Sequence, residues 1–155
     1  MKARTIALTL ALCAVGVTAG LAAADAHLGT WKLNAAKSKI APGAPKNDTV
    51  VYETVGDTVK ITVDGTDGAG KASHNEWTGK FDGKDYPVTG DPSVDARSYT
   101  RVDERTLTFA NKLAGKVLLT GRVVVSADGK TRTVTTTVTD STGKKVTSTA
   151  AFDKQ

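Results

Sequence analysis

Arg97, Tyr99 and Arg101 are the residues of this sequence whose types and spacing are best suited to bind an anion. Side chains two positions apart on an extended strand point to the same side, so two guanidinium groups and a phenol would lie together. Guanidinium groups bind carboxylates and phosphates through paired hydrogen bonds. The same three side chains could instead face solvent, because the residues between them do not form a clearly apolar face.

Aromatic residues could complete a pocket beside these arginines. Trp77 shares a strand face with Asn75 and Gly79, and Tyr52 and Phe109 could line the same cavity. Ligand pockets are mostly apolar and contain a few placed polar groups. The chain has only two Trp, three Tyr and three Phe, however, and a hydrophobic core could use them all as packing. Pocket lining and core packing both remain open.

His27 and His74 are the only histidines. A histidine at the first position of a processed chain can chelate copper through its amine and its ring if a second histidine lies nearby. The simpler interpretation is an exposed terminal residue and an ordinary strand histidine. We therefore predict no metal site and no cofactor.

The chain carries none of the common catalytic signatures. It has no Gly-x-Ser-x-Gly elbow, no His-Glu-x-x-His pair and no Gly-rich phosphate loop after a strand. Asp64, Asp67 and Asp82 fall in glycine-containing turns, where aspartate is favoured because its side chain bonds to the nearby backbone. We predict that the protein is not an enzyme.

Residues 1–26 have the three-part layout of a secretory leader. Lys2 and Arg4 precede an apolar run, and Ala24-Asp25-Ala26 fits the small-x-small cleavage pattern. We expect cleavage before His27 and a periplasmic or secreted protein without a membrane span. The alternative is an uncleaved anchor, but the run is rich in Ala, Gly and Thr and only weakly hydrophobic.

The formal net charge of +5 at pH 7 is distributed along the chain, and the longest basic run is Lys144-Lys145. Nucleic-acid-binding proteins concentrate positive charge on one face, so we predict no nucleic-acid partner. The only cysteine, Cys13, lies within the apolar run of the leader. The processed chain therefore has no disulfide and no thiolate site.

From Gly29 onward, short strand-like runs alternate with turn signals such as Gly56-Asp57 and Asp128-Gly129. After an opening strand at Gly29, the runs are residues 49–55, 58–64, 71–81, 86–88, 97–102, 106–112, 116–126, 131–139 and 145–152. Short connections imply that consecutive strands pair, which gives an all-β, antiparallel up-and-down arrangement of about 8–10 strands.

Closing such a meander into a barrel removes its exposed edges, so we predict a β-barrel in preference to a sandwich. Gly121, inside an otherwise apolar run, is expected to mark a bend or bulge needed for closure. Residues 27–155 are expected to form this single domain.

The opening strand, Gly29-Thr30-Trp31-Lys32-Leu33, resembles the Gly-x-Trp signature of lipocalins and fatty-acid-binding proteins, the calycin barrels. The resemblance implies that Trp31 plugs the closed end of the barrel and that an arginine from a late strand, Arg122 or Arg132, packs across it. Ala36-Lys37-Ser38-Lys39 and Tyr86-Pro87-Val88-Thr89-Gly90 also resemble parts of small exported bacterial proteins described as lipocalin-like.

Two features depart from the fatty-acid-binding pattern. Residues 34–48 contain Pro42, Gly43 and Pro45 and are predicted to form an irregular loop, where those proteins have a helical lid. Arg132 is followed by Thr133 and Val134, so their Arg-x-Tyr carboxylate clamp is missing. The resemblance thus implies a barrel, without implying their manner of holding fatty acids.

These observations predict an exported lipocalin-like protein that binds a small apolar or amphipathic ligand inside a barrel. The residues expected to contact the ligand are Tyr52, Trp77, Arg97, Tyr99, Arg101 and Phe109, and those expected to support the barrel are Gly29, Trp31 and Arg122. The alternative is a barrel with a packed interior that acts as an envelope protein-interaction module or inhibitor.

Overall fold

The computed structural model describes residues 24–155, which form ten β-strands and contain no helix. The strands are β1 (Gly29–Lys39), β2 (Lys46–Val55), β3 (Thr58–Thr66), β4 (Ala72–Gly79), β5 (Asp82–Thr89), β6 (Ala96–Asp103), β7 (Thr106–Leu113), β8 (Lys116–Val125), β9 (Thr131–Thr139) and β10 (Lys145–Lys154). The predicted all-β fold class is confirmed.

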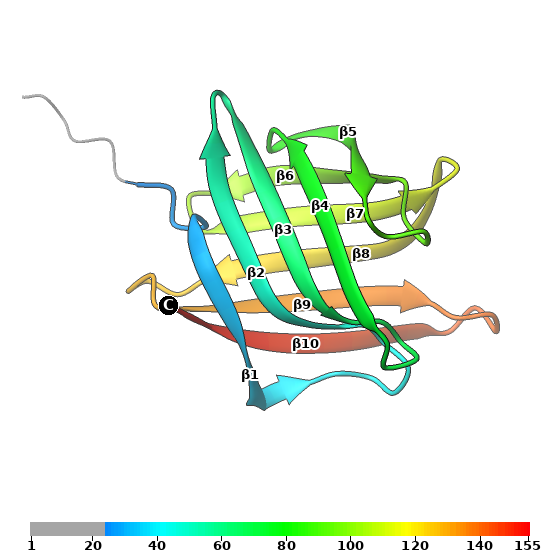
Figure 1. Ribbon diagram of the computed structural model, residues 1–155. Coiled ribbons are helices and arrows are strands. Elements are labelled where there is room, and N and C mark those ends of the chain that lie inside the picture. The colour runs from blue at the N-terminus through cyan, green and yellow to red at the C-terminus, as the bar shows by residue number, and fades with distance from the viewer. Residues whose placement is uncertain (1–23) are drawn as a thin grey trace, which may run out of the picture.

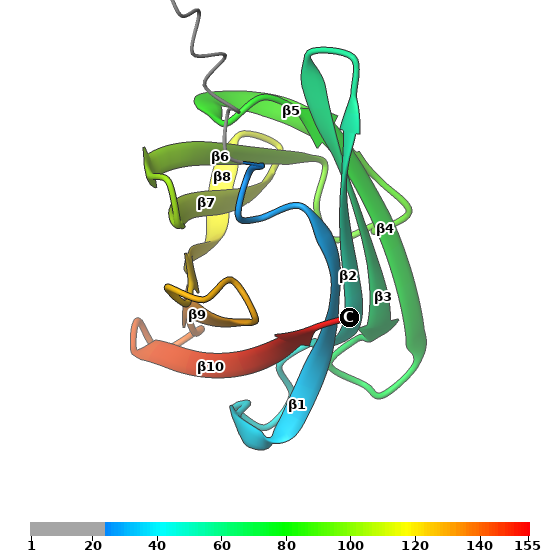
Figure 2. The same cartoon turned by 90° about the vertical axis from the view of Figure 1, so that its left-hand side faces the viewer.

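The ten strands close into one barrel (Figures 1 and 2). Each strand pairs antiparallel with its neighbour in the sequence, and β1 also pairs with β10 through Trp31 opposite Lys154 and Leu33 opposite Phe152. No strand is left with an unpaired edge along this ring, which is the physical advantage of closure. The predicted up-and-down barrel is confirmed, and the sandwich alternative is wrong.

The antiparallel pairing gives the barrel two ends. The odd-numbered strands begin at the end that holds residues 25–28 and the C-terminus (Figure 1), which we call the Trp31 end. They finish at the opposite end, where β6 begins close to Arg97, which we call the Arg97 end. The difference between these two ends determines where a ligand could enter.

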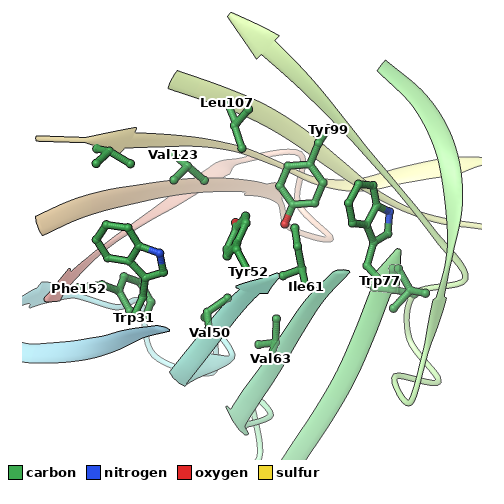
Figure 3. Packing of buried hydrophobic residues seen from close by; sticks show 13 residues of the cluster. Trp31, Val50, Tyr52, Ile61, Val63, Trp77, Tyr99, Leu107, Val123 and Phe152 are labelled. Carbon is green, nitrogen blue, oxygen red and sulfur yellow. The ribbon is translucent and has the colours of Figure 1, made fainter. Parts of the chain in front are cut away.

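Apolar side chains that point inward fill much of the barrel, from Trp31 at one end to Val88 and Val94 near the start of β6. Strand alternation is clear on β8, where Val123 and Val125 are each 2% exposed and Val124 between them is 40% exposed. The buried hydrophobic residues are Trp31, Val50, Tyr52, Ile61, Val63, Trp77, Val88, Val94, Tyr99, Leu107, Val123, Val125 and Phe152 (Figure 3).

The segment predicted as an irregular loop, residues 34–48, is mostly strand instead. β1 continues to Lys39 and β2 begins at Lys46, so the connection is short. The continuation is irregular, because the β1–β10 register shifts between Asn34 and Lys39. The Asn34 side chain accepts a hydrogen bond from the Lys37 amide at 3.2 Å. This local bond and the two prolines weaken the alternation by which strands are recognised in a sequence.

Gly121 has a packing role that differs from the predicted bend. It lies opposite Phe109 on β7, and a Cβ atom at Gly121 would fall 2.3 Å from the Phe109 ring. The missing side chain therefore gives that ring its space inside the barrel. The register shift between β7 and β8 occurs between Asn111 and Lys112 instead.

The predicted leader falls outside the described residues except for Ala24, Asp25 and Ala26. Residues 24–155 contain no helix with the length and apolar character needed to cross a membrane.

Candidate ligand site inside the barrel

The four predicted aromatic residues meet inside the barrel, and we call Tyr52, Trp77, Tyr99 and Phe109 the aromatic cluster. The rings of Trp77 and Tyr99 are 4.8 Å apart between centroids, and those of Tyr99 and Phe109 are 5.3 Å apart. Tyr52, Trp77 and Tyr99 are each less than 5% exposed. They pack as a core, with Tyr52 and Tyr99 between Trp31 and Trp77 (Figure 3).

The Tyr52 phenol is kept neutral by its surroundings. Burial raises the pKa of the Tyr52 phenol well above its ordinary value, and the neighbouring Tyr99 adds to the effect. The Tyr99 hydroxyl points toward Tyr52 in Figure 3. At neutral pH the Tyr52 phenol is a hydrogen-bonding group without charge, so it does not balance a buried cation.

Arg97 also lies inside the barrel and is only 6% exposed. Its Nε donates to Asn111 Oδ1 at 2.6 Å, and its Nη2 donates to Asn75 Oδ1 at 3.4 Å. Its carbonyl accepts a hydrogen bond from Trp77 Nε1 at 2.8 Å, which ties Arg97 to the aromatic cluster. Among the ion pairs between described residues, none includes Arg97.

Arg101 does not join Arg97, so the predicted two-arginine grip on one headgroup is not what the structure shows. Its side chain is 36% exposed at the Trp31 end, where it pairs with Asp25. Its guanidinium lies 5.0 Å from the centroid of the Phe81 ring. Both arginines occupy the same side of β6, but four residues of strand separate them by about 13 Å.

A row of apolar side chains leads away from Arg97 across neighbouring strands. Leu119 on β8 lies opposite Asn111, the residue that accepts the Arg97 hydrogen bond. Val138 on β9 lies opposite Leu119, and Val146 on β10 lies opposite Val138. We call Leu119, Val138 and Val146 the apolar row.

The apolar row faces the barrel interior. On β9, Arg132 is 3% exposed and Val134 packs against the core. Val138 is an even number of positions from both, so it points to the same side of the strand. Val138 is nevertheless only half-buried, as are Leu119 and Val146. The inward side of the barrel is therefore sealed at the Trp31 end and accessible to water along the apolar row at the Arg97 end.

Trp31 lies buried near one end of the barrel, and of the two candidate arginines it is Arg132 that packs across its ring. Trp31 is fully buried, and the Arg132 guanidinium lies 4.8 Å from its ring centroid and 4.9 Å from those of Tyr52 and Phe152. Arg122, the residue chosen from the sequence for a structural role, is exposed. It points outward because it alternates with the buried Val123 on β8.

Gly29 lies at this end of the barrel, at the start of β1. Its φ of +113° is strained for other residues, and a Cβ atom there would lie 2.9 Å from the Lys154 side chain. The Lys154 ammonium lies 5.1 Å from the centroid of the Trp31 ring. Close contact between the first and last strands thus favours glycine at this position.

The two histidines lie apart in different surroundings. His74 on β4 is half-exposed and bonds through Nδ1 to Asp64 at 2.6 Å. His27 is fully buried, and neither of its ring nitrogens has a hydrogen-bond partner among the described residues, so the expectation of an exposed residue was wrong. Within residues 24–155, no group of three His, Cys, Asp or Glu side chains could hold a metal ion.

Burial lowers the pKa of His27 from its ordinary value of 6.5 to about 4. The cations Arg101 and Arg132 lower it further, while the carboxylates of Asp25 and Asp103 partly oppose the change. As the pH is lowered, His27 is protonated in the unfolded chain before it is protonated in the folded protein. The stability that the neutral, buried His27 contributes is therefore complete above pH 6.5 and is lost as the pH falls toward 4.

We predict that the free energy of unfolding falls by up to about 3 kcal/mol between pH 7 and pH 4 on account of His27. Urea unfolding at a series of pH values measures it, and His27→Phe should flatten the curve between pH 6.5 and 4. His74→Gln is the matched control and should leave the slope in place. An equal slope in the His27 variant would contradict the assignment.

Two surface hollows lie outside the barrel interior. One of about 460 Å³ lies over the outer face of β6–β9, where threonines 100, 108, 135 and 137 surround Arg122. The other, of about 440 Å³, lies between the ends of β8 and β9 and is lined by Leu119 and several polar residues. Phe109 of the aromatic cluster also lines the first hollow, but neither hollow includes Tyr52, Trp77, Tyr99 or Arg97.

Sequence analysis did not identify Asn111, one of the two amide partners of Arg97. Asn111 would be found by counting alternate positions from Phe109 on β7, but its contact with Arg97 depends on register between strands.

No protein-family model matches the chain, and no curated protein matches it as a relative. The candidate function is therefore inferred from the residues at the Arg97 end.

Proposed function

We propose that the barrel binds a small amphipathic anion at the Arg97 end. The carboxylate or phosphate group of the ligand would bind Arg97, and its apolar part would lie along the apolar row. The observation that carries this proposal is the Arg97 guanidinium, which is nearly buried and has two neutral amides as its side-chain partners.

A buried cation without a counter-ion is costly, because the protein interior solvates charge poorly. Asn75 and Asn111 supply acceptor oxygens but no negative charge. Among the described residues, the Arg97 side chain donates hydrogen bonds through Nε and Nη2 only, so Nη1 has no partner there. Nη1 is not one of the atoms that are both fully buried and without a partner. A ligand carboxylate could take this free donor position and neutralise the charge in one step.

The apolar row supports the same ligand class. It continues the cross-strand line that begins at Arg97 and Asn111, so charged and apolar surfaces adjoin inside one end of the barrel. A ligand would enter at the Arg97 end, because Trp31 and Arg132 fill the other. Most of its affinity would come from burying its apolar part, and Arg97 would select the headgroup.

The closed barrel and the Trp31–Arg132 contact support a lipocalin-like relationship, and the N-terminal sequence supports export to the periplasm or beyond. We propose both on these grounds. Lipocalin-like barrels are suited to carry small molecules because closure leaves an interior that strands can line from all sides.

The proposal predicts that Arg97→Met removes headgroup selection. Unsubstituted protein should bind a medium-chain carboxylate, or the alkyl phosphate of equal length, at least about tenfold more tightly than the matching alcohol, a difference of about 1.4 kcal/mol. In Arg97→Met the three ligands should bind alike, because the cation is gone while the apolar row is intact. Isothermal titration calorimetry measures the three affinities.

Arg101→Met is the matched control, since it removes an arginine from the same side of β6 at the Trp31 end and should leave selection unchanged. Thermal unfolding checks that both variants fold. Equal affinity of the unsubstituted protein for the carboxylate and the alcohol would exclude Arg97 as the anchor.

The packed-barrel alternative is favoured by the aromatic cluster, whose members fill the centre of the barrel. In that case the protein would act through its outer surface, as an interaction module or inhibitor of the envelope. The same titrations separate the two functions, because a packed barrel would bind none of the three ligands.

A further inference from the structure

We propose that the leader is removed after Ala24, so that the processed protein begins at Asp25. This position is two residues earlier than the Ala24-Asp25-Ala26 pattern suggests. The inference rests on the prediction of a cleaved leader and is independent of the proposed ligand. It follows from the contacts that residues 25–28 make with the Trp31 end of the barrel.

Asp25 is held by three separate contacts. Its Oδ1 accepts a hydrogen bond from the His27 amide at 3.0 Å, and its carbonyl accepts one from the Leu28 amide at 3.1 Å. Its Oδ2 pairs with Arg101, and the Asp25 side chain is only 24% exposed. These contacts fold the segment into a turn and fasten it to β6.

The residues after Asp25 belong to the core. Ala26 and Leu28 pack against the buried hydrophobic cluster. The His27 ring is fully buried, with centroids 6.4 Å from those of Tyr52 and of Phe81. The His27 carbonyl accepts the hydrogen bond from Trp31 Nε1 at 2.9 Å. Residues 25–28 are therefore part of the barrel closure.

Cleavage before His27 would damage this closure. It would remove Asp25 and Ala26 and create an ammonium group at the His27 nitrogen, which now donates to Asp25. That new charge would lie next to the buried His27 ring, and Arg101 would lose its carboxylate partner. A charge that is brought beside a hydrophobic core without a partner is unfavourable. Cleavage before Asp25 keeps every one of these contacts.

The sequence allows the earlier position equally well. Ala22-Ala23-Ala24 also fits the small-x-small pattern that precedes a cleavage site. The two candidate patterns overlap at Ala24, so residue types alone do not separate them. The contacts of Asp25 provide the distinction.

The test is the intact mass of the protein recovered from the periplasm or medium after expression of the full chain. We expect a mass that begins at Asp25. A mass that begins at His27 would overturn the inference while leaving the leader prediction in place. A mass that retains residues 1–24 would overturn both, and none of these outcomes depends on ligand binding.

A second measurement tests the physical reason. Chains that begin at Asp25 and at His27 are released from a fusion partner without additional residues and compared by thermal unfolding. We expect the chain beginning at His27 to melt at least about 4 °C lower. Asp25→Asn in the longer chain should lose part of this difference. Asp57→Asn, at an exposed aspartate that pairs with Lys80, is the control and should not. Equal melting of the two chains would contradict the inference.

Discussion

Replacing Trp31 with alanine is expected to lower the free energy of unfolding by about 3–5 kcal/mol. Trp31 is fully buried and closes one end of the barrel. Its removal would leave a cavity, take away one of three rings around the Arg132 guanidinium and leave the His27 carbonyl without its donor. Each of these changes acts in the same direction.

Urea unfolding followed by circular dichroism measures this loss. Trp31→Phe should fall between the alanine variant and the unsubstituted protein, because it keeps part of the apolar volume and loses the N–H donor. Val124→Ala is the control, since Val124 is 40% exposed and its change should stay within about 0.5 kcal/mol. A loss below about 1.5 kcal/mol for Trp31→Ala would mean that the plug contributes little to folding.

The fold was predictable from the sequence because its signals are local. Alternation along β3, where Val59, Ile61 and Val63 are separated by polar residues, and the glycine-containing turns define strands and hairpins without knowledge of the rest of the chain. The continuation of β1 to Lys39 was missed because its irregular pairing with β10 depends on a register shift. Partners far apart in the sequence determine such a shift, so no local pattern indicates it.

The candidate site was only partly predictable, for a related reason. Spacing placed Arg97 and Arg101 on one side of β6, but it could not show that Arg97 is buried while Arg101 is partly exposed beside Asp25. The choice between Arg122 and Arg132 depended on which parity of each strand faces inward. That parity is fixed by the barrel as a whole.

The distribution of buried charge links stability to the proposed function. Arg132 is enclosed by three aromatic rings at the Trp31 end, and these contacts partly replace the water that a guanidinium loses on burial. The described contacts of Arg97 include no ring, and its side-chain partners are two amides. Arg132 nevertheless keeps its Nε and Nη1 without a hydrogen-bond partner among the described residues. Both buried arginines therefore lack a carboxylate partner there, and they differ in that Arg132 is covered by rings while Arg97 has amide acceptors.

Replacing Trp77 with alanine is the second change with a large expected effect, again about 3–5 kcal/mol of stability. Trp77 is 1% exposed, packs edge-on against Tyr99 and stacks on Phe81 at 6.2 Å. Its Nε1 also donates to the Arg97 carbonyl. The alanine variant would create a cavity in the middle of the aromatic cluster, and urea unfolding measures the loss.

The same variant distinguishes two positions for a ligand inside the barrel. If the ligand lies at the Arg97 end along the apolar row, Trp77→Ala should weaken carboxylate binding less than about tenfold. The reason is that the Trp77 ring belongs to the aromatic cluster and would not contact the ligand there. Trp77→Phe, which keeps an aromatic ring but removes the N–H donor, tests whether the bond to the Arg97 carbonyl matters for binding. A loss of binding much greater than tenfold in a folded Trp77→Ala protein would place the ligand within the aromatic cluster, and the assignment to the Arg97 end would then be wrong.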